Sequence, residues 1–229
     1  MPKKKGQLTG ANGFLPRNFR ICRPVAKIDN NLQFTHIGKR ALNTPGKCSP
    51  DGRFREYQYT REIAAAVVAR LQALGHDAEI LVPEFEDIPL AERVRRVNAW
   101  CHRLGKDHVV LVSVHVDAAG SDGQWHNATG WSCYTSPGQT VGDRLADCLY
   151  RAAEKHLPGH KIRTDYSDGD ADKEARFALL TRTRCAAALT ENGFQDSKES
   201  LAFLESPSGK KAIVGLHVEG ILEYLLTSS

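Results

Sequence analysis

The segment Val109–His115, with the sequence Val-Val-Leu-Val-Ser-Val-His, constrains the fold more than any other part of this chain. All residues before the histidine are apolar or small, which is typical of a strand buried on both faces of a parallel sheet. In open α/β sheets, ligands bind just beyond the carboxyl ends of the strands. His115 therefore lies where such folds place their chemistry, although a single histidine there is more often a core residue that donates to a backbone carbonyl.

Strand-like and helix-like segments alternate from about residue 30 to the end of the chain. Two of the expected loops lie at 157–175, a segment rich in Asp and Gly, and at Glu191–Gly193, directly after a predicted strand. This alternation predicts an α/β fold in which helices flank a central sheet. We expect strands at 31–37, 78–82, 109–115, 130–135 and 186–190, and helices at 56–74, 90–104, 140–156, 196–204 and 210–226.

One globular domain is expected at residues 25–229, preceded by a basic, flexible arm at residues 1–24. Its content of 41% hydrophobic and 25% charged residues is ordinary for a globular protein. There is no run of about 18 apolar residues, so membrane insertion is not expected. Basic residues begin the chain, but no apolar segment follows them. We therefore expect synthesis in the cytoplasm without a signal peptide.

Charge is distributed unevenly along the chain. Residues 1–28 hold seven basic residues and no acidic one, so the remainder carries a net charge of −3 against +4 for the whole chain. A basic arm can contact nucleic acid or an anionic envelope polymer, but a solubilising tail is the simpler interpretation. No nucleic-acid-binding motif with interleaved aromatic residues is present, so nucleic acid is not an expected partner.

Three further residues occupy positions where metal ligands and proton-transfer groups are often found. His36 follows a partly apolar segment, Glu56 opens a predicted helix, and Glu191 follows a predicted buried segment. Taken singly, each has a structural explanation, as a loop histidine, a helix-dipole partner or a helix cap. Catalytic zinc usually takes three ligands from histidines and carboxylates, and a further carboxylate must handle protons. These three residues are therefore the candidates to join His115 in such a site.

Other common signatures are absent from the sequence. There is no HExxH helix, no GxSxG nucleophile elbow, no P-loop and no dinucleotide fingerprint. The aspartates between residues 165 and 172 do not follow the EF-hand order, and the six cysteines form no CxxC pair. Histidine and glutamate side chains are therefore the best candidates for chemistry.

Taken in order along the chain, these groups resemble the zinc-dependent N-acetylmuramoyl-L-alanine amidases, and especially the phage endolysin and prophage type. The resemblance covers about residues 30–226. Its motifs are an early histidine, a glutamate that opens the first helix, a Ser-x-His strand end, and a late Thr-Glu-Asn-Gly-Phe segment. The longest matching segment is Thr44–Tyr57, and shorter ones are Gly130–Trp131 and Ser167–Glu174.

The resemblance implies a function and a site. His36, Glu56 and His115 would bind one Zn²⁺ per chain, and Glu191 would be the catalytic carboxylate. The implied fold is a central, mostly parallel twisted sheet flanked by helices, as in phosphorylase/hydrolase-like folds. The substrate would be peptidoglycan, cut between N-acetylmuramic acid and L-alanine. A monomeric enzyme would act on the cell wall after release from the cell.

Two departures from the family pattern leave alternatives open. His36 lies in Phe-Thr-His-Ile-Gly rather than an Asp-x-Gly-His-Gly type of segment. Asp117 stands where the family tends to have asparagine, which adds negative charge and makes Asp117 a candidate substrate-binding residue. A zinc peptidase acting within the stem peptide is one alternative. Others are a non-catalytic wall-binding relative, and an envelope- or nucleic-acid-binding module that uses the basic arm.

Overall fold

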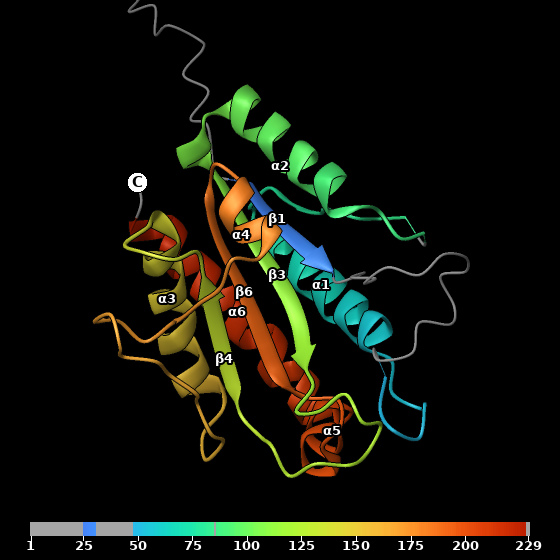
Figure 1. Cartoon of the computed structure of the whole chain (residues 1–229). Coiled ribbons are helices and arrows are strands. Elements are labelled where there is room, and N and C mark those ends of the chain that lie inside the picture. Colours follow the sequence, from blue (N-terminus) through green and yellow to red (C-terminus); the bar gives the residue numbers. More distant parts are fainter. Residues whose placement is uncertain (1–24, 31–47, 85, 228–229) are drawn as a thin grey trace, which may run out of the picture.

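The valine-rich segment forms β3 (Val109–Asp117), near the middle of a six-stranded sheet with the order β2-β1-β3-β6-β4-β5 (Figure 1). The computed structural model describes residues 25–30, 48–84 and 86–227. All neighbouring strands pair in parallel except β4 and β6, which are antiparallel. The prediction of a mostly parallel sheet is therefore confirmed. The other strands are β1 (Val25–Asn30), β2 (Ala78–Ile80), β4 (Trp131–Thr135), β5 (Lys173–Glu174) and β6 (Ala186–Phe194).

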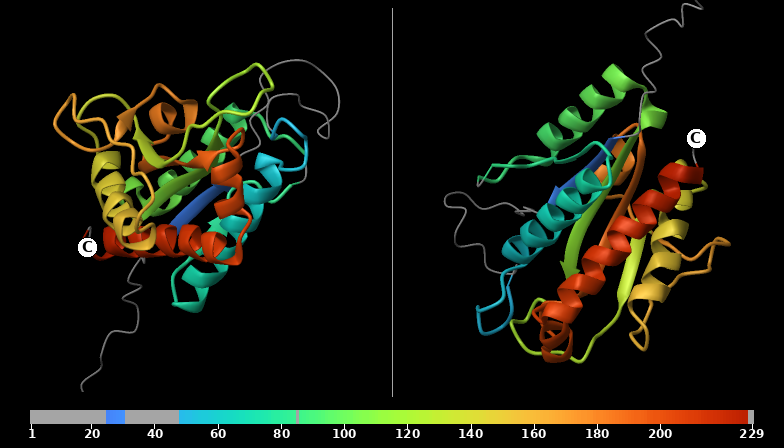
Figure 2. Two further views of the ribbon diagram at one scale, coloured as in Figure 1. Left: turned by 90° about the horizontal axis from the view of Figure 1, so that it is seen from below. Right: turned by 180° about the vertical axis from the view of Figure 1, so that it is seen from behind.

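Helices cover both faces of this sheet. Figure 2 shows α1, α3 and α6 on one face, whereas α2 and α4 lie on the other, over the amino-terminal ends of β3 and β6. The carboxyl ends of these two strands extend beyond α2 and α4, as α/β folds with strand-end sites require. The helices are α1 (Glu56–Ala73), α2 (Leu90–Leu104), α3 (Val141–His156), α4 (Ala178–Arg182), α5 (Lys198–Leu204) and α6 (Pro207–Thr227), with a short 3₁₀ turn at Lys106–His108.

Strand β3 separates two apolar cores because its side chains alternate between the faces. Val110, Val112 and Val114 pack among side chains of α1, α3 and α6. Val109 and Leu111 pack among side chains of α2 and α4. Each buried aliphatic side chain of this kind contributes roughly 1.5–3 kcal/mol of transfer free energy. This double burial explains why the valine-rich segment could be recognised as a strand.

The expected loop at Glu191–Gly193 is wrong. Strand β6 continues to Phe194, because it pairs with β3 on one side and with β4 on the other. Glu191 and Asn192 are therefore strand residues with defined directions. The expected loop at 157–175 is also partly wrong, since it contains β5, and α4 was not expected.

Most expected elements are confirmed within a few residues of their predicted ends. Helix α6 begins earlier than predicted, at Pro207, a residue whose fixed φ suits the first helical position. The expected strand at 31–37 and the expected arm at 1–24 lie outside the described residues. Strand β1, which lies at Val25–Asn30, was not expected. Within the described ranges, none of the helices has the length and apolar character needed to span a bilayer.

Candidate active site

His115 and Glu191 lie side by side at the carboxyl end of the two central strands. They are partners in register across the parallel β3–β6 pair, so their side chains lie on the same face of the sheet. Ser132 of β4 is the partner of Glu191 on its other side. His115 is only 4% exposed, and Glu191 is partly buried. The sheet therefore brings together two of the five predicted site residues.

Glu56 joins this pair from the first residue of α1. Its Oε1 atom lies 3.4 Å from Nδ1 of His115 and accepts a 3.1 Å hydrogen bond from the backbone N–H of Val116. The Glu56 side chain is almost fully buried. A buried carboxylate placed beside an imidazole is a costly arrangement, which is typical of a functional site rather than of a helix-dipole partner.

A tight turn before α1 holds Glu56 in place. Ser49 Oγ accepts from the backbone N–H of Phe54 and donates to Asp51 Oδ1, at 3.0 and 2.6 Å. Arg53 forms an ion pair with Asp51 at 2.8 Å. Hydrogen bonds from Ser49 and Arg53 lower the pKa of Asp51 to about 2. Asp51 therefore stays ionised near neutral pH, and the turn keeps its hydrogen bonds.

Ser113 orients the imidazole of His115. Its hydroxyl lies 2.9 Å from Nε2, on the side of the ring away from Glu56. If Nε2 carries the proton, it donates to the Ser113 oxygen and leaves Nδ1 unprotonated toward Glu56. Metal-binding histidines usually donate their other ring N–H to such a partner. The sequence singled out the Ser-x-His pattern but did not predict this contact.

The donor set fits a zinc ion. Two ligand atoms about 2.0–2.2 Å from a tetrahedral zinc are about 3.3–3.6 Å apart. The separation of 3.4 Å between Glu56 Oε1 and His115 Nδ1 lies within this range. Within the described ranges, no three histidine, cysteine or acidic side chains lie close enough together to hold a metal ion by themselves. The predicted ligand His36 lies outside those ranges, so its contribution remains a prediction.

Asp117, the fourth residue singled out near this strand end, forms an ion pair with Arg163. The Nη2 atom of Arg163 donates to Asp117 Oδ2 at 3.0 Å and to Ser132 Oγ at 2.8 Å. The guanidinium also lies 4.5 Å from the ring centroid of Phe194. Arg163 thus balances the negative charge of Asp117. Nothing in the sequence around Arg163 indicated this contact, which depends on the sheet.

The loop after β3 is fixed by Asp196. Its carboxylate accepts from the backbone N–H groups of Ala119 and Gly120, at 3.0 and 2.9 Å. The backbone N–H of Gln195 donates to the carbonyl of Asp117 at 2.7 Å. The sequence interpretation of Glu191 as a helix cap nearby is not supported, because Ser197 caps α5.

Solved structures share this fold. An N-acetylmuramoyl-L-alanine amidase, AmiC2, of Nostoc punctiforme has a TM-score of 0.69 at 22% identity, covering 89% of this chain and 98% of that chain. An N-acetylmuramoyl-L-alanine amidase from Clostridium difficile 630 has a TM-score of 0.69 at 22% identity, covering 91% and 100%. At this identity, the likeness supports the fold.

Curated relatives match in sequence. The chain is 32% identical over 138 residues to an endolysin of Bacillus phage SPP1, covering 59% of this chain and 45% of the endolysin. It is 29% identical over 169 residues to the N-acetylmuramoyl-L-alanine amidase CwlM of Bacillus licheniformis, covering 73% and 59%. The chain thus spans about half the length of these relatives. A family model described as N-acetylmuramoyl-L-alanine amidase matches residues 35–223. This match covers most of the chain, which therefore belongs to the N-acetylmuramoyl-L-alanine amidase family.

Proposed function

We propose that this chain hydrolyses the amide bond between the lactyl group of N-acetylmuramic acid and L-alanine in peptidoglycan. The observation that carries the proposal is the pairing of Glu191 with His115 across β3 and β6. Oε1 of Glu56 lies 3.4 Å from Nδ1 of the same histidine. A histidine, a buried carboxylate and a second carboxylate on one sheet edge are the groups that metal-assisted amide hydrolysis requires. The family match supports the same reaction.

His36, Glu56 and His115 would hold one Zn²⁺ per chain. When bound, zinc would polarise the scissile carbonyl and bring the pKa of a water ligand toward about 7. The two described ligands have fixed orientations, because Ser113 holds the far nitrogen of His115 and Val116 donates to Glu56. Such outer contacts orient the side chains that would hold a metal.

Glu191 would perform the proton transfers. Its carboxylate takes a proton from the attacking water as the water oxygen bonds to the carbonyl carbon. It then gives that proton to the nitrogen of L-alanine as the carbon–nitrogen bond breaks. The products are a lactyl carboxylate and a peptide with a free amino group. Placement on a strand between two neighbouring strands gives Glu191 the fixed position that this role needs.

Asp117 would contribute to substrate binding together with Arg163. The ion pair at 3.0 Å holds the guanidinium beside Ser132, the strand neighbour of Glu191. Stem peptides carry carboxylates, which a guanidinium binds with good geometry. In this arrangement Asp117 orients Arg163 toward the substrate and limits the excess positive charge.

The setting of the reaction would be the cell wall. The SPP1 relative is an endolysin, which supports a role in degrading the wall after release from the cell. We propose that the chain acts there as a monomer on its polymeric substrate.

A matched pair of glutamine variants tests the proposal. Glu191→Gln should abolish hydrolysis of a soluble muropeptide while leaving zinc content unchanged, because Glu191 is not a proposed ligand. Glu154→Gln, on the exposed face of α3, is the control and should retain full activity. Activity that survives in Glu191→Gln would contradict the assignment of the proton-transfer group.

A further inference from the structure

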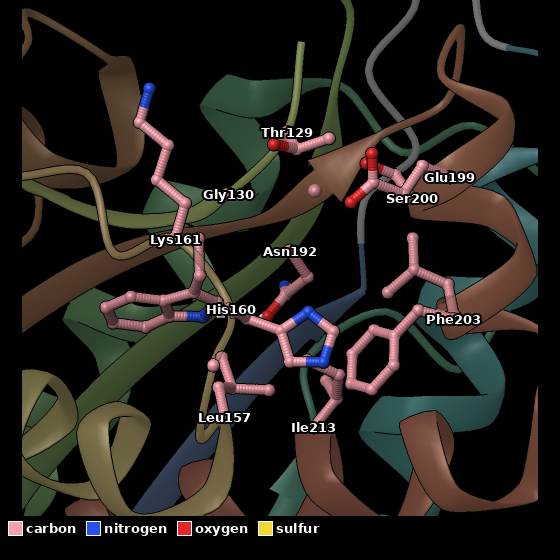
Figure 3. Close-up of a pocket in the computed structure, with 14 residues that line it drawn as sticks. Thr129, Gly130, Leu157, His160, Lys161, Asn192, Glu199, Ser200, Phe203 and Ile213 are labelled. Atoms are coloured by element: carbon pink, nitrogen blue, oxygen red, sulfur yellow. Dashed lines mark hydrogen bonds between the residues drawn. The ribbon is translucent and has the colours of Figure 1, made fainter. Parts of the chain in front are cut away.

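Asn192 is buried on the opposite face of β6 from Glu191 and reaches the main chain of His115. Its Nδ2 atom donates to the His115 carbonyl at 2.9 Å, and its Oδ1 atom accepts from Trp131 Nε1 at 3.0 Å. Asn192 is 1% exposed and Trp131 is 2% exposed. Asn192 and Trp131 also line a cavity of about 210 Å³ together with side chains of α5 and Ile213 of α6. Figure 3 shows Asn192 among the residues that line this cavity.

Asn192 is also connected to α6, through the side chain of Thr190. Its Nδ2 atom donates to Thr190 Oγ1 at 3.2 Å, and Thr190 Oγ1 lies 2.8 Å from Nε2 of His217. Nδ1 of His217 lies 2.7 Å from the carbonyl oxygen of Ile213. Thr190 and His217 are fully buried. These contacts form one continuous polar chain from the α6 backbone to the site strand.

The shorter contacts of this polar network set one order of donors and acceptors, because Thr190 Oγ1 lies 2.8 Å from His217 Nε2 but 3.5 Å from the Ser113 carbonyl oxygen. A carbonyl only accepts, so Nδ1 of His217 carries the proton and Nε2 accepts from the Thr190 hydroxyl. Thr190 Oγ1 then accepts from Asn192, whose other amide hydrogen goes to His115. The indole N–H of Trp131 only donates, which fixes the orientation of the Asn192 amide. A fully satisfied buried network of this kind is rigid.

The network meets β3 where the regular ladder is interrupted. Pairing of β3 with β6 shifts register between His115 and Asp117. Next to this break the Asn192 side chain donates to the His115 carbonyl. The orientation of the His115 backbone sets the direction in which its side chain leaves the strand, and therefore whether Nδ1 faces Glu56. A side chain that holds this carbonyl therefore acts on the geometry of the site.

We propose that Asn192, held by Trp131 and by the Thr190–His217 pair, is a positioning residue that sets the metal affinity of the His115–Glu56 site. The inference rests on the proposed function only through the assignment of His115 as a ligand. Removing an outer partner of a metal ligand typically weakens metal binding by about 10- to 100-fold. The same loss is expected here, through a contact that never touches the metal or the substrate.

The test is zinc binding by the full chain, measured by competition with a chromophoric chelator. Asn192→Leu, which keeps the approximate volume, should weaken zinc binding by about 10- to 100-fold. Thr190→Val should weaken it by a smaller factor, and Thr190→Ser, which keeps the hydroxyl, should restore wild-type affinity. Substituted Co²⁺ should show a shifted visible absorption band in Asn192→Leu, because the ligand geometry changes.

Thr135→Val is the matched control for Thr190→Val. Thr135 is a buried threonine of β4, and its hydroxyl donates to Asp172 at 2.6 Å rather than to a member of the Asn192 network. It should lower the melting temperature and leave zinc affinity unchanged. Wild-type zinc affinity in both Asn192→Leu and Thr190→Val, with a similar loss of melting temperature, would overturn the proposal. If Asn192→Leu does not fold, Trp131→Phe removes one donor from the same network. Weakened zinc binding in Trp131→Phe would then support the proposal, and wild-type zinc affinity would overturn it.

A variant of the proposed ligand His115 distinguishes an error in the ligand assignment from an error in the positioning role of Asn192. His115→Ala should abolish zinc binding. If it binds zinc like the wild type, the assignment in the proposed function is wrong. If it loses zinc while Asn192→Leu retains it, only the positioning role is wrong.

Discussion

His115 and Glu191 are register partners on adjacent parallel strands, and their side chains share one face at the carboxyl end of the sheet. This relationship converts two residues far apart in the sequence into neighbours with fixed directions. Glu56 lies on the other side of His115, at 3.4 Å from Nδ1. The imidazole therefore lies between a candidate ligand partner and a candidate proton-transfer group.

Glu56→Gln is expected to separate metal binding from stability. The variant keeps the shape of the side chain and an acceptor for Val116, but it removes a buried charge beside His115. Zinc affinity should fall by about 10-fold or more, whereas the chelator-treated protein should melt at the same or a higher temperature. Chelator competition and thermal melts measure the two effects.

Glu62→Gln, on the same helix, is the control because Glu62 forms an exposed ion pair with Lys210 at 2.7 Å. It should change neither zinc affinity nor activity. A Glu56→Gln variant that binds zinc like the wild type would remove Glu56 from the site.

The Asp117–Arg163 pair is expected to act on substrate binding more than on the chemical step. Asp117→Asn frees Arg163 from its ion pair and Arg163→Gln removes the guanidinium, so both should raise KM for a muropeptide. A double-mutant cycle should give a coupling free energy of about 0.5–3 kcal/mol, since the two side chains are in contact. Additive effects in the cycle would contradict the proposed cooperation.

The buried His217 is expected to make the free energy of unfolding depend on pH. Burial lowers the pKa of His217 from its ordinary value of 6.5 to about 4. The unfolded chain therefore binds a proton between these two values while the folded chain does not. Stability should fall as pH decreases from about 6.5 to about 4, by roughly 3 kcal/mol from this group, and then level off.

Denaturant unfolding at a series of pH values measures this effect. His217→Gln should flatten the difference between pH 7 and pH 4.5, whereas His102→Asn, on the exposed face of α2, should keep the wild-type slope. A wild-type slope in His217→Gln would show that another group titrates in this range.

Asp172 is expected to make the free energy of unfolding depend on pH in the opposite direction. Burial, together with the neighbouring Asp170, raises the pKa of Asp172 to about 7. The folded chain thus retains a proton that the unfolded chain loses above about 4, so this contribution to stability is lost as pH rises through 7. Asp172→Asn should raise the melting temperature at pH 8 and have a smaller effect at pH 5. Asp168→Asn, in the exposed loop, is the control.

The sequence predicted the parts of the fold that depend on local pattern. Val109–His115 reads as a buried strand because apolar residues face both cores. Glu56 could be placed because a helix start is visible in the sequence, and the structure puts it beside His115. These features are encoded in neighbouring residues, and the structure confirms them.

What the sequence could not predict depends on pairing between distant segments. Strand β6 runs on through Glu191 because two neighbouring strands hold it, whereas its local composition indicated a loop. Arg163 and Asn192 reach the site from loops and strands whose neighbours give no hint of the contact. A register shift next to His115 likewise exists only in the assembled sheet.

Hydrolysis of a soluble muropeptide in heavy-oxygen water, followed by mass spectrometry of the products, tests the central claim most directly. The account predicts that heavy oxygen enters the lactyl carboxylate of muramic acid, and that L-alanine appears with a free amino group. Glu191→Gln should release no labelled product. Label in a carboxylate within the stem peptide would identify a peptidase, and no cleavage by the zinc-loaded chain would contradict an enzymatic role.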